Sequence, residues 1–197
     1  MTTTIRSLKS FKTPLRYPGG KSRACKKMEP FFPDLRDYDV YYEPFLGGGS
    51  VALHITKKYP KLKIVVNDLY EPLYNFWLQL QVNGDYVHTE LQQLKSRFPD
   101  RGSARGLFLD AKEKLYDLDV SDKDRAVCFY IINKCSFSGL TESSSFSSQA
   151  SDANFSMRGI DKLPVYSKLI KDWYITNVDY HHLLGDKEKT FVYLDPP

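Results

Sequence analysis

Residues 40–55 read VYYEPFLGGGSVALHI and change from a strand pattern to a helix pattern across three glycines. The β-prone run ends near Phe45, and Ser50 suits the start of the helix that follows. Pro60 ends this helix, and residues 63–68, KIVVND, are apolar enough for a strand buried on both faces. The order of strand, glycine turn, helix and strand predicts a βαβ unit. We therefore expect a largely parallel sheet with a right-handed crossover.

A helical pattern occupies most of the middle of the chain. From residue 71 to about residue 132, apolar residues recur at three- and four-residue steps, as on the buried face of a helix. A polar, basic stretch from Lys95 to Arg105 is expected to be a loop between two of these helices. Residues 173–178 and 191–194 are β-prone and predict two further strands.

These patterns divide the chain into three segments of an α/β fold. Residues 1–70 hold the first part of a Rossmann-like sheet, residues 71–160 form a mainly helical insertion, and residues 161–197 return to the sheet. No stretch approaches the roughly 20 apolar residues that a membrane-spanning helix needs, so no membrane partner is expected. Three cysteines without paired spacing favour a reducing, cytoplasmic compartment and predict neither a disulfide framework nor a metal site.

Positive charge is concentrated at the start of the chain. The net charge is only +4, yet eight Lys and Arg residues precede the first acidic residue, Glu29. Pro14, Pro18 and two glycines interrupt this run, so it is a poor fit to an amphipathic transit peptide. Two interpretations stay open, a phosphate-binding arm or loop and a solvated basic terminus.

Residues 136–159 are rich in serine and carry Phe137, Phe146 and Phe155 at intervals. Serine-rich stretches are typical of flexible linkers. Interspersed phenylalanines need a surface to pack on, which favours an exposed loop that docks onto a partner such as a nucleic acid. Both interpretations stay open.

The glycine turn also carries a ligand-binding pattern. Gly47 to Ala52 fit G-x-G-x-x-A directly after a strand, and Asp68 ends the next strand about 20 residues on. Glycines let the backbone approach a ligand, and the carboxylate accepts protons from the ribose hydroxyls of an adenosine-containing ligand. A plain glycine turn and a nicotinamide dinucleotide site share this pattern. Glu43 argues against the dinucleotide, because a carboxylate beside the turn suits a cationic ligand better than a pyrophosphate.

A second motif, Asp195-Pro196-Pro197, follows the last predicted strand. Two prolines continue neither a helix nor a sheet ladder, so the carboxylate and the adjacent carbonyls are held rigid at the end of the strand. Open α/β sheets bind their ligands at that edge. An ordinary loop start is the plain alternative for this tripeptide taken alone.

Five motifs occur in one order along the chain: Arg16-Tyr17-Pro18-Gly19-Gly20-Lys21, Glu43 to Val51, Asn67-Asp68, Asn133-Lys134-x-x-Phe137-Ser138-Gly139-Leu140, and Asp195-Pro196-Pro197. In this order they resemble the Dam-type DNA adenine methyltransferases over nearly the whole chain. The resemblance implies transfer of a methyl group from S-adenosylmethionine to N6 of adenine in DNA. It also implies a Rossmann-like methyltransferase sheet with an inserted, mainly helical DNA-recognition subdomain.

The resemblance implies roles for individual residues as well. Residues that would contact the cofactor S-adenosyl-L-methionine are Tyr17, Lys21, Phe45, Gly47, Gly49, Asp68, Asp179 and Asp195. Among these, Asp68 would hold the ribose and Asp179 would lie beside the cofactor's adenine. Asp195 and the Pro196 carbonyl would be catalytic, because they would bind the exocyclic amine of the target adenine. The DNA contacts would come from Asn133, Lys134, Phe137, Ser138 and Leu140, on double-stranded DNA with the target adenine flipped out.

The sequence stops at the second proline of the last motif, Pro197. In the family an aromatic ring follows that proline and grips the flipped base. The resemblance therefore implies that this ring and the C-terminal strands of the sheet are missing here, which leaves the strand ending at Leu194 as an open, apolar edge. We expect residues 1–197 alone to have little or no methyltransferase activity, and full activity in a tritiated-methyl transfer assay would contradict this.

Two further expectations follow from the same resemblance. The protein is expected to be a monomer, or to be completed by a second chain that supplies the C-terminal part. The alternative function is a catalytically dead remnant that still binds DNA or S-adenosylmethionine.

Overall fold

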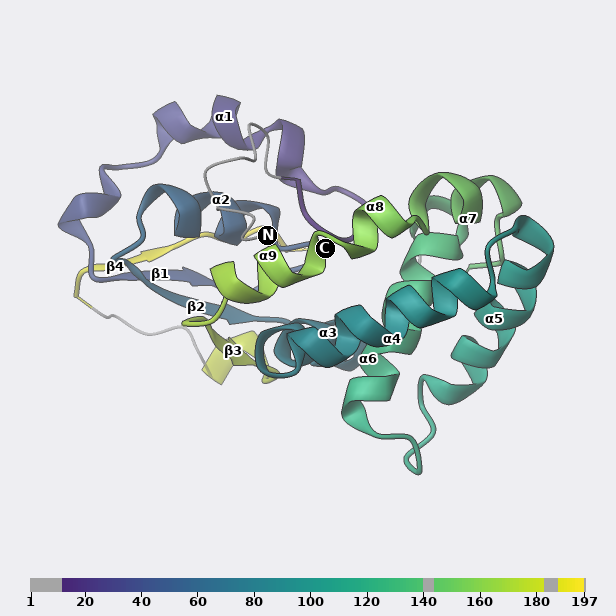
Figure 1. The fold of residues 1–197 in the computed structure, drawn as a ribbon. Helices are drawn as coiled ribbons and strands as arrows, with labels where there is room; N and C mark the ends of the chain where they lie inside the picture. Colours follow the sequence, from purple (N-terminus) through teal and green to yellow (C-terminus); the bar gives the residue numbers. More distant parts are fainter. Residues whose placement is uncertain (1–11, 140–143, 183–187, 197) are drawn as a thin grey trace.

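The computed structural model describes residues 12–139, 144–182 and 188–196. Four parallel strands form a sheet in the order β3-β2-β1-β4. Figure 1 shows this sheet on one side of the molecule, and the helices α4 to α8 extend away from it on the other. The strands are β1 (Val40–Glu43), β2 (Lys63–Asn67), β3 (Tyr174–Thr176) and β4 (Thr190–Val192).

The predicted βαβ unit is confirmed. A glycine turn joins β1 to helix α2 (Ser50–Lys58), and the chain then enters β2 parallel to β1. The first strand ends two residues earlier than Phe45, because Pro44 has no N–H to donate to the ladder. Both predicted C-terminal strands are also present. Within the described residues, β3 and β4 are the two edge strands, and β4 pairs with β1 alone.

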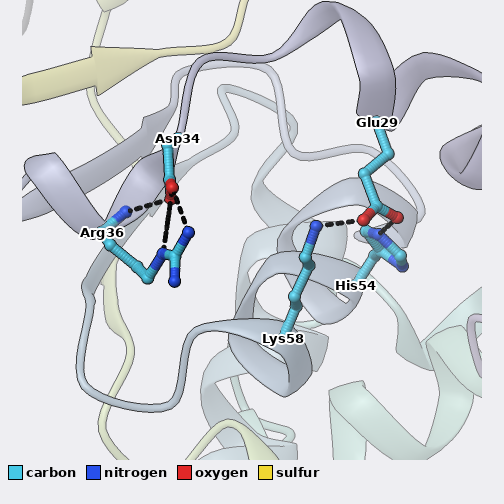
Figure 2. Close-up of polar contacts among 5 residues, drawn as sticks. All are labelled: Glu29, Asp34, Arg36, His54 and Lys58. Carbon is cyan, nitrogen blue, oxygen red and sulfur yellow. Dashed lines mark hydrogen bonds and ion pairs between the residues drawn. The ribbon is translucent and has the colours of Figure 1, made fainter.

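Short helices carry the basic N-terminal run toward β1: η2 (Lys21–Arg23), α1 (Cys25–Met28), η3 (Glu29–Phe31) and η4 (Leu35–Asp37). Figure 2 shows how Glu29 links this segment to α2. One Glu29 oxygen lies 3.1 Å from Nε2 of His54, and the other pairs with Lys58 one turn further along the helix. The start of the basic run, residues 1–11, lies outside the described residues.

The helical insertion begins with α3 (Glu71–Val82), α4 (Gly84–Arg97), α5 (Arg101–Lys114) and α6 (Asp122–Cys135). The prediction of a loop over Lys95–Arg105 is wrong, since α4 continues to Arg97 and α5 starts at Arg101. The Asp100 side chain accepts hydrogen bonds from the N–H groups of Gly102 and Ser103, which caps α5 at its first turn. The polar stretch therefore contains the end of α4, a short connection and the start of α5, which Asp100 caps.

Helix α6 forms the centre of the helical layer. All of its residues from Ala126 to Cys135 are buried. The Phe76 ring of α3 lies 5.9 Å from the Tyr130 ring and 5.7 Å from the Phe129 ring, between ring centroids. Because α3 also contacts β3, this aromatic cluster joins the insertion to the sheet.

The described part of the serine-rich stretch is ordered into helices and is not a linker. It contains η5 (Phe137–Gly139), α7 (Ser148–Asn154) and α8 (Met157–Ile160), and α9 (Leu163–Leu169) follows. Ser147 and Ser156 act as N-caps for α7 and α8. Phe155 is fully buried, whereas Phe137 is 61% exposed and available for docking. In the part of the chain that the structure describes, no helix is both long and apolar enough to cross a membrane.

Candidate functional site

The carboxyl ends of all four strands meet at one edge of the sheet, because every pair is parallel. The glycine turn after β1 is built for close packing at this edge. Gly47 and Gly49 have φ values of 50° and 66°, in the left-handed region that side chains rarely adopt. A Cβ on Gly49 would lie 2.7 Å from the ring of Trp77, whose indole N–H donates to the Gly47 carbonyl at 3.2 Å.

Asp68 fixes the other side of the turn. Its Oδ2 accepts a hydrogen bond from the Gly47 N–H at 2.8 Å, and its Oδ1 accepts one from the Tyr70 N–H at 3.0 Å. Burial raises the pKa of this carboxyl group, and the two N–H donors oppose that shift. Each oxygen keeps a second lone pair, so the group can still accept protons from a ligand's hydroxyls.

Asn67 lies next to Asp68 at the predicted site, although the sequence motifs assign it no role. It is 1% exposed, and its side chain connects three strand ends. Its amide nitrogen donates to the carbonyls of Pro44 and Val178, and its amide oxygen accepts from Val178 N–H and the Thr176 hydroxyl. In the sequence, the one sign of this linking role is that a polar amide ends the largely apolar strand KIVVN.

The N-terminal loop lies against this turn. A Cβ on Gly47 or Gly48 would come within 2.9 Å of Tyr17. The preceding residue, Arg16, is held by Asn133 of α6. The Asn133 amide oxygen accepts from the Arg16 N–H at 2.9 Å, and its nitrogen donates to the Arg16 carbonyl at 2.6 Å. One short segment therefore contacts the glycine turn on one side and the helical insertion on the other.

Lys21 and Asp195 are brought together. The Lys21 ammonium lies 2.6 Å from Oδ2 of Asp195 and also donates to the Gly19 carbonyl at 2.9 Å. Both side chains are about one third exposed, at 32% and 36%. The predicted catalytic carboxylate is thus paired with a predicted cofactor residue at the carboxyl end of β4. Pro196 is exposed, and Pro197 lies outside the described residues.

Phe45 and Asp179 lie at the side of the site nearest β3. The Phe45 ring is 5.1 Å from the ring of Tyr180 in η7 (Tyr180–His182). Asp179 accepts hydrogen bonds from the N–H and the Nδ1 of His181, and the backbone N–H lowers the pKa of this carboxyl group most. The structure therefore brings the segments after β1 and β3 together at the predicted cofactor side.

Glu43, the last residue of β1, is a buried acid, and its burial could not be read from the sequence. It is 3% exposed, and its Oε2 accepts a hydrogen bond from the Tyr41 hydroxyl at 2.7 Å. Burial raises the pKa of Glu43 to about 8, and the nearby carboxylates of Asp195 and Asp68 add to this effect. The side chain is therefore mostly protonated at neutral pH.

We expect Glu43→Gln to weaken the pH dependence of stability. Between pH 4.5 and pH 8 the folded protein holds a proton on Glu43 that the unfolded chain releases, so the free energy of unfolding falls as pH rises. The slope due to one such proton is at most about 1.4 kcal/mol per pH unit. Urea unfolding at pH 5, 6, 7 and 8 measures it. Glu113→Gln, on the exposed face of α5, serves as the control and should keep the wild-type slope.

The predicted DNA-contact residues fall into two groups. Asn133 and Lys134 are buried at 0% and 9%, and Asn133 positions Arg16 instead of presenting its amide at the surface. Burial, followed by the positive charge of Arg16, lowers the pKa of Lys134 to about 7. Phe137 and Ser138 are exposed, and Ser138 has a φ of 54°. Leu140 lies outside the described residues.

A cleft of about 1070 Å³ lies at the opposite end of the sheet. It is lined near the starts of β1 and β2 by residues that include Asp39, Tyr59 and Leu62, and it extends to the Asp34–Arg36 pair seen in Figure 2. None of the predicted site residues lines it. Ligands of open α/β sheets bind at the carboxyl ends of the strands, so this cleft is not the site that the motifs predict. Within the described ranges, no group of three or more His, Cys, Asp or Glu residues is arranged to hold a metal ion.

Comparison with known proteins agrees with the arrangement of these motifs. Residues 17–197 match the model of the D12 class N6 adenine-specific DNA methyltransferases. The chain is 26% identical to the type II methyltransferase M.MjaIII of Methanocaldococcus jannaschii, over 93% of this chain and 68% of that protein. It is 23% identical to the modification methylase StsI of Streptococcus sanguinis, over 96% of this chain and 29% of that protein. The chain belongs to the D12 class of N6 adenine-specific DNA methyltransferases.

Proposed function

We propose that this protein binds S-adenosylmethionine at the carboxyl edge of the sheet and directs its methyl group to the N6 amine of adenine in DNA. Asp68 accepts the ribose hydroxyls, Tyr17 packs on the ligand beside the glycine turn, and Asp179 lies at the adenine end. The residues fit such a ligand, because Tyr17 lies directly against the side-chain-free glycine turn and the carboxyl groups of Asp68 and Asp195 at this edge suit a cation. When bound, S-adenosylmethionine supplies the methyl group.

Asp195 and the Pro196 carbonyl are proposed to hold the target amine. The lone pair of an aromatic amine is delocalised into its ring, which makes the amine a poor nucleophile. Two acceptors on its protons orient that lone pair and stabilise the positive charge that develops as the methyl arrives. In the structure Lys21 pairs with Asp195, so the amine would have to share or replace this contact.

One observation supports the proposal most directly. The glycine turn, Asp68 and the Lys21–Asp195 pair, which come from distant motifs, lie at one edge of the sheet. The test is chemical: DNA is incubated with the protein and tritiated S-adenosylmethionine, and the DNA is then digested to nucleosides. All label that reaches the DNA is expected in N6-methyladenine, whatever the rate. Label in a methylated cytosine would contradict the proposal.

Phe137 is proposed to contact DNA directly. It is 61% exposed at η5, directly after the buried C-terminal end of α6. Stacking of an aromatic ring on a base contributes about 1–3 kcal/mol, so Phe137→Ala should weaken DNA binding by roughly 5- to 150-fold. Fluorescence anisotropy with labelled duplex DNA at fixed salt measures this.

A matched control is available in the same helical layer. Leu118 is another exposed apolar residue, at 89% exposure, in the turn between α5 and α6. Leu118→Ala removes a similar apolar surface away from η5 and should leave DNA affinity unchanged. Equal losses for the two variants would show that Phe137 has no specific role.

A further inference from the structure

Three carboxyl groups converge at the carboxyl edge of the sheet, one after each of three neighbouring strands. They are Glu43 at the end of β1, Asp68 after β2 and Asp195 after β4, and both aspartates act electrostatically on Glu43. Among the described residues, the ion pair with Lys21 is the one salt bridge that any of the three makes. The edge therefore has one ion-pairing cation for three carboxyl groups in the described part of the chain.

The groups that face Glu43 determine how readily it loses its proton. Its carboxyl group takes hydrogen bonds from the Tyr41 hydroxyl and from the backbone N–H of Ala52 in α2. The thiol of Cys25 in α1 and the phenol of Tyr193 after β4 also face it. Burial raises the pKa of Cys25 to about 11 and that of Tyr193 to about 12, so neither ionises near neutral pH.

Glu43 is also placed to respond to a cation in the predicted site. It lies four residues before the glycine turn and is hydrogen-bonded to α2, the helix that the turn starts. A buried carboxyl group is neutral because its surroundings do not stabilise the charged form, and a positive charge brought nearby reverses this balance. S-Adenosylmethionine carries a sulfonium charge, whereas its demethylated product, S-adenosylhomocysteine, has a neutral thioether in the same position.

We propose that Glu43 releases its proton to solvent when S-adenosylmethionine binds, and that its carboxylate then acts as the counter-charge by which the site distinguishes the sulfonium cofactor from its neutral product. Glu43 is in this scheme a positioning and specificity residue, buried at the end of β1 and not in contact with the target base. The inference rests on the proposed function, since it requires the cofactor to bind at this edge.

Proton-linked calorimetry tests the inference. The protein is titrated with S-adenosylmethionine and, separately, with S-adenosylhomocysteine at pH 7 in buffers of different ionisation enthalpy, which gives the number of protons released. With a pKa of about 8 for the free protein, we expect release of roughly 0.9 proton with the cofactor and far less with the product. The ratio of the two affinities should rise up to tenfold per pH unit between pH 6 and pH 8 and then level off.

Two variants complete the experiment. In Glu43→Gln, proton release with the cofactor should disappear and the affinity ratio should no longer change with pH. The ligands' own amino groups titrate identically in both proteins and so cancel in this comparison. In Tyr41→Phe, which removes a hydrogen bond that stabilises the Glu43 carboxylate, the rise should persist but move to higher pH.

The outcomes separate this inference from the proposed function. Equal proton release with the two ligands, or unchanged release in Glu43→Gln, would overturn the role of Glu43 while leaving the cofactor site intact. If Glu43→Gln does not fold, an unshifted curve in Tyr41→Phe would overturn it. If neither ligand binds the wild-type protein, the proposed function fails and this inference fails with it.

Discussion

Gly49→Val is expected to lower the free energy of unfolding by about 2–5 kcal/mol. Gly49 has a φ of 66°, and a Cβ at this position would lie 2.7 Å from a Trp77 ring carbon. The left-handed conformation contributes roughly 1–2 kcal/mol of this loss and overpacking against the indole contributes about 1–3 kcal/mol. Urea unfolding followed by tryptophan fluorescence and by circular dichroism measures it.

Gly106 provides a control with the opposite expected sign. It lies on the exposed face of α5, and a Cβ there would meet no heavy atom within 4 Å. Gly106→Ala should stabilise the protein by about 0.5–1 kcal/mol, because alanine restricts the unfolded chain and favours the helix. If Gly49→Val unfolds at the same urea concentration as the wild type, the result contradicts the close packing of Gly49 against Trp77.

Asp68→Ala is expected to weaken binding of S-adenosylmethionine by at least 100-fold. The two ribose hydroxyls would lose a charged acceptor, and hydrogen bonds to a charged group contribute about 1.5–3 kcal/mol each. The Gly47 and Tyr70 N–H groups would lose their acceptor as well, which loosens the turn that surrounds the ligand. Isothermal titration calorimetry measures the affinity, and circular dichroism confirms that the variant is folded.

Two companion variants make this result specific. Asp68→Asn keeps a neutral oxygen acceptor and should show an intermediate loss of affinity. Asp119→Ala removes an exposed carboxyl group between α5 and α6, far along the chain from the turn, and should bind as the wild type does. Wild-type affinity in Asp68→Ala would remove Asp68 from the proposed site.

The features that could be predicted from sequence are those with a local physical cause. Glycines after a strand, a helix start at Ser50 and a strand ending in Asp68 are readable within about 30 residues, and the structure confirms this unit. The loop prediction over Lys95–Arg105 was wrong for an equally local reason. Polar, basic composition is compatible with helix, and a single cap at Asp100 is enough to start one.

The features that could not be predicted depend on partners far away in the chain. Asn67 bonds to residues up to 111 positions later, and Asn133 holds a backbone segment 117 positions earlier. Neither contact leaves a periodic pattern, since a buried amide looks the same in sequence whether it binds DNA or a distant carbonyl. In the fold, the Asn133 side chain is hydrogen-bonded to the backbone of Arg16, a contact that sequence alone does not reveal.

The contact between Arg16 and Asn133 has a consequence for how the two halves of the site work together. Gly139, at the end of η5, also packs against Arg16, since a Cβ there would lie 2.8 Å from its carbonyl oxygen. The loop that carries Tyr17 and Lys21 therefore lies between the glycine turn and the exposed Phe137 segment. Its position makes it the direct physical connection between the proposed cofactor site and the proposed DNA-contact residues.

The most direct test of the central claim, that the glycine turn and Asp68 hold S-adenosylmethionine, is calorimetric titration of the wild-type protein with two ligands. S-Adenosylmethionine and NAD both contain the adenosine that this turn pattern can accept. We predict one-to-one binding of S-adenosylmethionine, lost in Asp68→Ala, and no binding of NAD. Binding of NAD without binding of S-adenosylmethionine would contradict the account.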